Sequence, residues 1–126
     1  MEIRNDMIKG FDKETAPLSE YEERTLLPIM VRCLARKRGR TSAVTGAYIC
    51  DRLKGLGYDI NGARVRKLVN HIRVKGLVPR LIATSDGYYI ATDNAELAGY
   101  IDSLRGREQA IRAVREAMER QSSTLI

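Results

Sequence analysis

The sequence predicts a mainly helical α+β protein with a three-helix core, a two-stranded β-hairpin and a long C-terminal helix. Three observations lead to this fold class. Apolar residues recur at spacings of three and four in four separate segments, which is the helical period. An Asp-Gly pair separates two short β-prone runs within residues 78–92. The chain has 126 residues, a length that favours one domain with a modest core.

The first helix is expected at about 19–38. Residues 1–17 mix charged and apolar residues without a sustained period, so we expect a flexible N-terminal arm there. Ser19 and Glu22 have the spacing of a capping box, and apolar residues follow at helical spacing. Pro28 lies inside this helix and should bend it or shift its start, because proline cannot make the backbone bond to the residue four before it.

The middle of the chain predicts a short strand followed by a second helix. Residues 41–44 (TSAV) have the length and β-branched character of a strand. Thr45 is suited to cap the second helix, and Gly55 and Gly57 mark its end.

The third helix is expected from the cap Asn61 to about Lys75, with Gly76 as its terminator. On a helical wheel four apolar residues form one stripe suited to pack on the first two helices: Val65, Leu68, Val69 and Ile72.

A hairpin and a long helix complete the predicted order. The hairpin spans 78–92, with its turn at Ser85–Gly87. Asp93 and Glu96 can form a second capping box, opening a helix to about Gln121, and Gly106 is a weak point within it.

The positive charge is concentrated in the middle of the chain. Residues 1–30 hold four cations and seven acids, a net −3, and residues 81–126 hold five cations and seven acids, a net −2. Residues 31–80 hold thirteen cations and two acids, a net +11. This asymmetry predicts a polyanionic partner, while the alternative is a solvated basic face without a partner.

The third helix concentrates this charge, because it has five cations and no acid: Arg64, Arg66, Lys67, Arg73 and Lys75. An α-helix fits the major groove of duplex DNA, where Arg and Lys pair with guanine and Asn pairs with adenine. A helix pair followed by Gly76 and a hairpin matches a helix-turn-helix with a two-stranded wing. We therefore expect groove contacts from Arg64, Arg66, Lys67 and Asn70, and phosphate contacts from Arg40, Thr41, Thr45, Arg73 and Arg80. Asp86 at the wing tip should repel phosphate.

The run NGARVRKLVNHIRVKGLVPRLIATSDGYYIAT (61–92) resembles the winged-helix segment of small, mostly uncharacterised helix-turn-helix proteins of bacterial phages and prophages. The flanking GRTSAVTGAYICDRL and AELAGYIDSLRGREQAI are similar too, so the resemblance covers roughly residues 20–112. The resemblance implies a winged-helix fold and DNA binding, and it implies no settled biological role. We therefore expect a winged helix-turn-helix at 18–92 that binds double-stranded DNA, as a phage or prophage regulator or an accessory factor in replication or packaging. The alternative is an adaptor that uses the same fold to bind proteins in a phage or replication assembly.

Other chemistries are disfavoured by the residues present. His71 is the only histidine and has no Cys, Asp or Glu partner at ligand spacing, so we expect no metal, no other cofactor and no small-molecule ligand. The basic region is poor in carboxylates and lacks a nucleophile–base pattern, so we expect no enzyme activity. RNA binding is a less favoured hypothesis, because the sequence indicates no exposed aromatic platform for stacking bases. Binding to a membrane surface is less favoured still, because the apolar face of the third helix is expected to pack in the core.

Residues 93–126 have two open readings. Leu97, Ile101, Leu104, Ile111 and Met118 form a near-heptad seam that is interrupted by Glu108. In one reading the first half of this helix (Leu97, Ile101 and Leu104) packs on the first helix and closes the core. In the other, the second half pairs with a symmetry mate to form a homodimer. The chain has neither a signal-peptide pattern nor a membrane-length apolar run, and Cys33 and Cys50 fit buried free thiols. We therefore expect a cytoplasmic protein that does not enter membranes.

Overall fold

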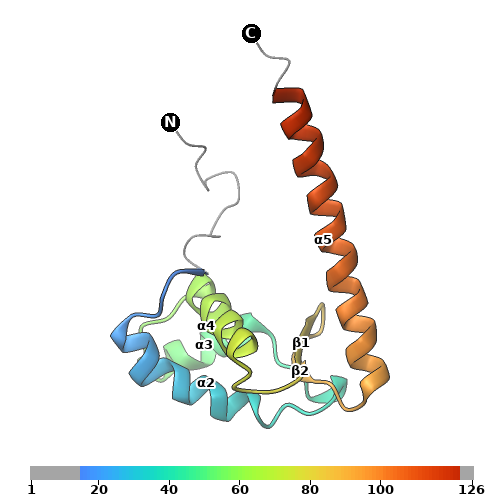
Figure 1. Ribbon diagram of the computed structural model, residues 1–126. Helices are drawn as coiled ribbons and strands as arrows, with labels where there is room; N and C mark the ends of the chain where they lie inside the picture. Colours follow the sequence, from blue (N-terminus) through green and yellow to red (C-terminus); the bar gives the residue numbers. More distant parts are fainter. Residues whose placement is uncertain (1–14, 123–126) are drawn as a thin grey trace. The chain divides into compact units, whose positions relative to one another are not determined.

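The protein, described by a computed structural model for residues 15–122, divides into two compact units after Thr92. The first unit contains helices α2 (Leu27–Leu34), α3 (Gly46–Gly55) and α4 (Gly62–Lys75), followed by strands β1 (Leu81–Thr84) and β2 (Gly87–Ile90) (Figure 1). The second unit contains one helix, α5 (Asn94–Ser122). The predicted α+β class is confirmed at this level: helices dominate, with a two-stranded antiparallel sheet and a long C-terminal helix. The expected arm lies mostly in residues 1–14, outside the described residues.

The first helical stretch contains a wide turn where the sequence places its proline. The capping box is confirmed, since Ser19 Oγ accepts from the Glu22 N–H at 3.1 Å and Glu22 Oε1 accepts from the Ser19 N–H at 2.8 Å. Residues Glu22–Leu26 then form a π-helical turn, and Pro28 lies in the first turn of α2. A proline ring clashes with the carbonyl four residues before it. We infer that the wider turn relieves this clash and lets the helix continue past Pro28. The helix ends at Leu34, whereas the sequence predicted an end near residue 38.

The ends of α3 and α4 are those the sequence predicts. Thr45 Oγ1 accepts from the Tyr48 N–H at 3.0 Å and caps α3. Asn61 Oδ1 accepts from the Arg64 N–H at 2.8 Å and caps α4, and Gly76 ends α4 in the left-handed conformation at a φ of 70°. These local bonds satisfy backbone groups that have no partner within the helix.

The predicted strand at 41–44 is wrong, because Arg40–Ser42 form a 3₁₀ turn. The residues on either side of that turn nevertheless pair with β2. Before it, the Ile90 N–H donates to Lys37 O at 2.6 Å, and after it Val44 and Tyr88 exchange two backbone bonds at 2.8 and 3.0 Å. The segment therefore covers the outer edge of β2 without being a continuous strand.

The hairpin is tighter than its Asp-Gly signal alone indicates. Thr84 pairs with Gly87, so the turn is the two residues Ser85 and Asp86, and Gly87 is already in β2. Gly87 has a φ of 116°, and a Cβ there would lie 2.5 Å from Val44 O. Glycine is required both by this backbone conformation and by the close approach of Val44.

The core lies within the first unit. The apolar stripe predicted for α4 is buried, and α4 packs against α2 and α3. The buried hydrophobic cluster comprises Leu26, Met30, Leu34, Val44, Ile49, Cys50, Leu53, Ile60, Val65, Leu68, Val69, Ile72, Val78, Leu81 and Ile90. Cys33 and Cys50 are free thiols, of which Cys50 is buried. Aliphatic side chains supply most of this core, as the scarcity of aromatic residues requires.

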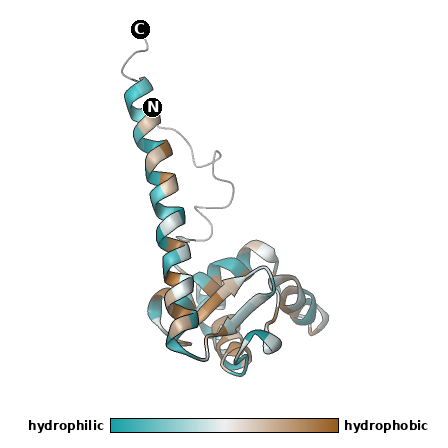
Figure 2. Ribbon diagram, turned by 90° about the vertical axis from the view of Figure 1, so that its right-hand side faces the viewer, coloured by the Kyte–Doolittle hydropathy of each residue, from teal (hydrophilic) through white to brown (hydrophobic). Residues whose placement is uncertain are grey.

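Helix α5 forms a unit without a buried residue. Asp93 Oδ1 accepts from the Glu96 N–H at 2.8 Å at its start, and the helix continues through Gly106. The buried cluster of the first unit contains no residue of α5, and core closure by this helix stays a prediction. Figure 2 shows apolar and polar positions alternating along α5. Among residues 15–122 no helix is long and apolar enough to span a bilayer.

Candidate nucleic-acid interface

Helix α4 presents a narrow ridge to solvent along its whole length. Gly62, Arg66, Asn70 and Val74 follow each other at intervals of four residues, and all four are exposed, Val74 by 74%. Residues four apart lie on the same face of a helix. The ridge therefore combines a guanidinium, an amide and a methyl-bearing side chain on the face opposite the buried stripe.

Two cations flank this ridge and a third follows the helix. Arg73 is half-buried beside the ridge, and Lys75 is exposed in the last turn. Arg80 is exposed immediately before β1 and has a φ of 63°. A non-glycine residue in the left-handed region is uncommon and costs conformational energy. The Arg80 carbonyl accepts the Ala91 N–H at 3.0 Å, which ties this conformation to the base of the hairpin.

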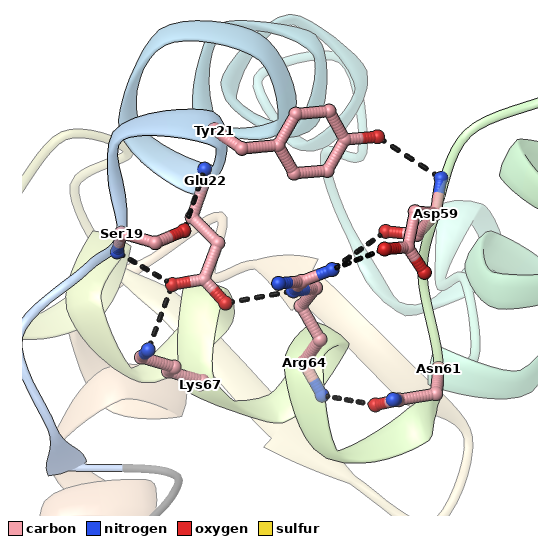
Figure 3. A network of polar contacts seen from close by, with 7 residues as sticks. All are labelled: Ser19, Tyr21, Glu22, Asp59, Asn61, Arg64 and Lys67. Atoms are coloured by element: carbon pink, nitrogen blue, oxygen red, sulfur yellow. Dashed lines mark hydrogen bonds and ion pairs between the residues drawn. The ribbon is translucent and has the colours of Figure 1, made fainter.

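Two other cations of α4 have a partner inside the protein, the carboxylate of Glu22 (Figure 3). Only 3% of Glu22 is exposed. Arg64 Nε donates to Glu22 Oε2 at 2.8 Å, and Lys67 Nζ donates to Oε1 at 2.7 Å. With the capping bond from the Ser19 N–H, the carboxylate accepts from three groups on two segments of the chain.

This surrounding keeps Glu22 ionised. Burial alone would raise its pKa, but the hydrogen bonds from Lys67, from the Ser19 N–H and from Arg64 together lower it more, to about 2 from an ordinary value of 4.5. The same pairing raises the pKa of Arg64, chiefly through its hydrogen bond to Glu22. The cluster thus joins one carboxylate at the start of the first helical stretch to two cations of α4.

Arg64 extends this contact to the loop before α4. Its Nη1 lies 3.4 Å from a carboxylate oxygen of Asp59 and donates to the Asp59 carbonyl at 2.9 Å. Its guanidinium carbon also lies 5.4 Å from the centre of the Tyr21 ring, whose hydroxyl accepts from the Asp59 N–H at 2.9 Å. Arg64 therefore connects α4 with the first helical stretch and with the loop at Asp59, as Figure 3 shows.

Part of the positive charge of α4 is therefore neutralised by a residue of another segment, Glu22. The helical wheel places Lys67 on the outer face, yet its long side chain reaches back to Glu22 and is only 13% exposed. Sequence reasoning assigned Glu22 to a capping box but missed its second role, because its partners lie 42 and 45 residues further along the chain. Of the four residues expected in a groove, Arg66 and Asn70 lie on the exposed ridge, and Arg64 and Lys67 lie in the Glu22 cluster.

The residues expected at phosphates lie in different surroundings. Arg40 pairs with Asp86 at 2.7 Å and lies over the Tyr89 ring at 5.5 Å, so the acid at the hairpin turn has a counter-ion. Thr41 is exposed in the 3₁₀ turn. Thr45 is exposed and caps α3 with its hydroxyl.

The first unit stays strongly basic after these internal pairs are counted. Residues 15–92 hold fourteen cations and six acids, a net +8. Three of the acids (Glu22, Asp59 and Asp86) are paired to Arg64, Lys67 or Arg40. Residues 15–92 thus hold eight more cations than acids, and this excess favours an external polyanion.

Residues 15–122 contain no cluster of three His, Cys, Asp or Glu side chains able to hold a metal ion. Comparisons with protein-family models, with curated proteins and with solved structures gave no significant match to the chain. Its function is therefore inferred from its own residues and their geometry.

Proposed function

We propose that residues 18–92 are a winged helix-turn-helix that binds double-stranded DNA through α4. The observation that carries the proposal is the exposed ridge of α4 with Arg66 and Asn70, within residues 15–92 of net charge +8. Helix α3 packs against α4 as the first helix of such a motif would, and the β1–β2 hairpin follows in the position of the wing. We propose that it serves as a phage or prophage regulator or as an accessory factor in replication or packaging.

The ridge has side chains suited to base edges. Arginine pairs with the two acceptors of guanine, asparagine pairs with adenine, and an apolar side chain contacts the methyl group of thymine. Arg66, Asn70 and Val74 supply one of each along a single helical face. Arg73 and Arg80 flank this face and are assigned to phosphates, which position the protein without reading sequence. Arg40, Thr41 and Thr45 are a second set of phosphate candidates, with Arg40 shared between Asp86 and the DNA.

Arg64 and Lys67 take a different role in this proposal. Both lie against the buried Glu22 carboxylate at 2.7–2.8 Å. Moving either one to DNA would leave a buried charge with one partner fewer, which is unfavourable. We therefore assign them to holding α4 against the first helical stretch. Of the four residues expected to contact bases, Arg66 and Asn70 keep that role.

Binding is tested by fluorescence anisotropy with labelled duplex DNA in a salt titration. Binding driven by phosphates weakens linearly in log–log form as salt rises, because bound counterions are released. We expect duplex binding at low ionic strength with such a slope. Absence of any binding to duplex at low salt contradicts the proposal.

Three variants separate the roles of the cations. Replacing Arg66 and Asn70 together by alanine should reduce base preference by about 1–3 kcal/mol, as measured against sequences selected from a random duplex pool. Arg80→Ala should weaken binding to all sequences alike and reduce the salt slope by about one. Arg64→Ala is the matched control on the same helix: it should lower thermal stability without a selective change in base preference.

One observation favours the second candidate function, a protein-interaction adaptor. A groove between α2 and α3 has an apolar lining that includes Ile29, Met30, Ile49, Leu53 and Leu56, with Tyr48 and Leu56 more than half exposed. Exposed apolar surface of this kind marks partner sites. A partner that remains bound after nuclease treatment and is lost with Leu56→Asp would support the adaptor. Partners that are all released by nuclease would count against it.

A further inference from the structure

The second half of α5 presents an apolar stripe to solvent. Leu104, Ile111, Val114 and Met118 are 40%, 70%, 61% and 52% exposed. At 100° per residue these four lie within about 80° of arc. Their separations of seven, three and four residues are those of a heptad seam, in which Arg107 takes the one remaining position. Such a stripe on a continuous 29-residue helix is suited to pairing with another helix.

The two flanks of this stripe differ. On one side lie Ala110 and Ala117, whose small side chains permit a close approach of two helices. On the other side lie Glu108 and Arg115, of opposite charge and one heptad apart. Arg115 binds Glu119 in its own helix at 2.9–3.0 Å, whereas Glu108 makes no ion pair with any of residues 15–122.

We propose that α5 pairs with α5 of a second copy of this chain in antiparallel orientation. In this arrangement Ile111 of each chain faces the partner's Val114, and Glu108 of each chain faces the partner's Arg115. The pairing has a two-fold axis between residues 112 and 113, so both contacts occur twice. It is independent of DNA binding, because none of these residues belongs to the first unit.

The charges select the orientation. In a parallel pair in register, Arg107 would lie in the seam directly against the partner's Arg107, which is unfavourable. Glu108 would then lie beside the partner's Ser103, and Arg115 beside the partner's Ala110, so neither charge would be paired. In the antiparallel pair Arg107 lies beside the partner's Met118 instead, and both charged flanks are complementary.

The charges also select the register. A shift of one heptad in one direction brings Glu108 against the partner's Glu108. The opposite shift brings Arg115 against the partner's Arg115. Like charges at flanking positions suppress wrong pairings, as they do in other coiled coils. Of these three registers, only the one in which Ile111 faces the partner's Val114 places Glu108 and Arg115 against opposite charges.

The test is charge reversal followed by mixing, with the full chain in sedimentation equilibrium. Glu108→Arg and Arg115→Glu should each weaken self-association about tenfold, because each creates two like-charge contacts per dimer. An equimolar mixture of the two variants should recover the wild-type dissociation constant to within about threefold, because each chain then supplies the opposite charge to the other. Asp102→Arg is the matched control: Asp102 lies on the opposite face and pairs with Arg105, away from Glu108 and Arg115, so the same reversal there should leave association unchanged.

Three outcomes would overturn the proposal. The first is a wild-type chain that stays monomeric up to about 1 mM. The second is a dissociation constant of the single variants equal to that of wild type. The third is a mixture of the two variants that associates no more tightly than either variant alone. Far-UV circular dichroism of each variant shows whether α5 is still helical. Ile111→Glu, which puts a charge in the seam without touching the flanks, should abolish association of the helical chain, and unchanged association would equally refute the pairing.

Discussion

Glu22 links the start of the first helical stretch to α4. Its carboxylate is buried, and transfer of an ionised carboxyl from water is costly unless donors replace the lost hydration. Three donors do so, from the Ser19 N–H, Arg64 and Lys67. Such a cluster adds little to stability compared with an apolar contact of the same size, but loss of one member leaves the others buried and uncompensated.

Glu22→Gln should therefore be strongly destabilising. The amide keeps the shape of the side chain but removes the charge that faces Arg64 and Lys67. We expect the free energy of unfolding to fall by about 3 kcal/mol, measured by urea denaturation followed by circular dichroism. Glu20→Gln is the matched control: Glu20 pairs with Arg24 on the surface at 3.3 Å, with both side chains more than 70% exposed. Its loss should change stability by less than about 0.5 kcal/mol.

The same residue should confer acid sensitivity. Its pKa is about 2 in the folded protein and near 4.5 in the unfolded chain, so the unfolded state binds the proton more tightly. The contribution of Glu22 to stability is thus complete above about pH 4.5 and is lost as the pH falls towards 2. We expect the difference in unfolding free energy between wild type and Glu22→Gln to shrink over this window, as measured by urea denaturation at each pH. A difference independent of pH would contradict the assignment.

At the scale of elements, the segment before α3 and the hairpin depend on each other. Lys37 and Val44 bond to the two ends of β2 on either side of the 3₁₀ turn. An isolated two-stranded hairpin is marginally stable in water, and a further pairing partner stabilises it. The close approach of Val44 is possible only because Gly87 has no side chain.

Gly87→Ala should break this arrangement. The new methyl group would meet the Val44 carbonyl at 2.5 Å, and alanine is strained at a φ of 116°. We expect a loss of at least about 2 kcal/mol in the free energy of unfolding, together with faster hydrogen exchange of the Val44 and Tyr88 amides.

Gly106→Ala provides the contrast within α5. No atom lies within 4 Å of the position its Cβ would take. Because alanine favours the helix over glycine by about 1 kcal/mol, this change should increase the helicity of α5. A loss of helicity there would contradict the exposed position of Gly106.

At the scale of the whole molecule, the chain has two compact units, residues 1–92 and 93–126. Among residues 15–122, all the buried hydrophobic residues lie between Leu26 and Ala91. The two proposals divide in the same way, with DNA assigned to the first unit and self-association to the second. A fragment that ends at Thr92 should separate them.

The fragment 1–92 should fold on its own, because its core is complete. We expect its thermal unfolding to stay cooperative and its melting temperature to lie within a few degrees of that of the full chain at low protein concentration. It should bind duplex DNA as a monomer, with lower apparent affinity for paired sites than the full chain. Loss of cooperative unfolding in the fragment would show that α5 is part of the folding unit.

Local signals in the sequence were enough to place most elements and their ends. The caps Ser19, Thr45 and Asn61 and the terminator Gly76 act through bonds to residues three or four away, so a short window contains the whole interaction. The 3.6-residue period likewise predicted the buried stripe of α4. The apolar spacing along α5 could also be seen from the sequence. The solvent exposure of its apolar side chains could not.

The tertiary structure decided which charges on α4 face outward. Arg64, Arg66 and Lys67 are alike in composition and close in sequence, and a helical wheel cannot tell which of them has a carboxylate nearby. Glu22 neutralises Arg64 and Lys67 from more than 40 residues away. The 3₁₀ turn at 40–42 in place of a strand depends in the same way on β2, which is distant in sequence. Contacts between residues distant in sequence have no short-range signature, and only the folded chain shows that Arg64 and Lys67 contact Glu22.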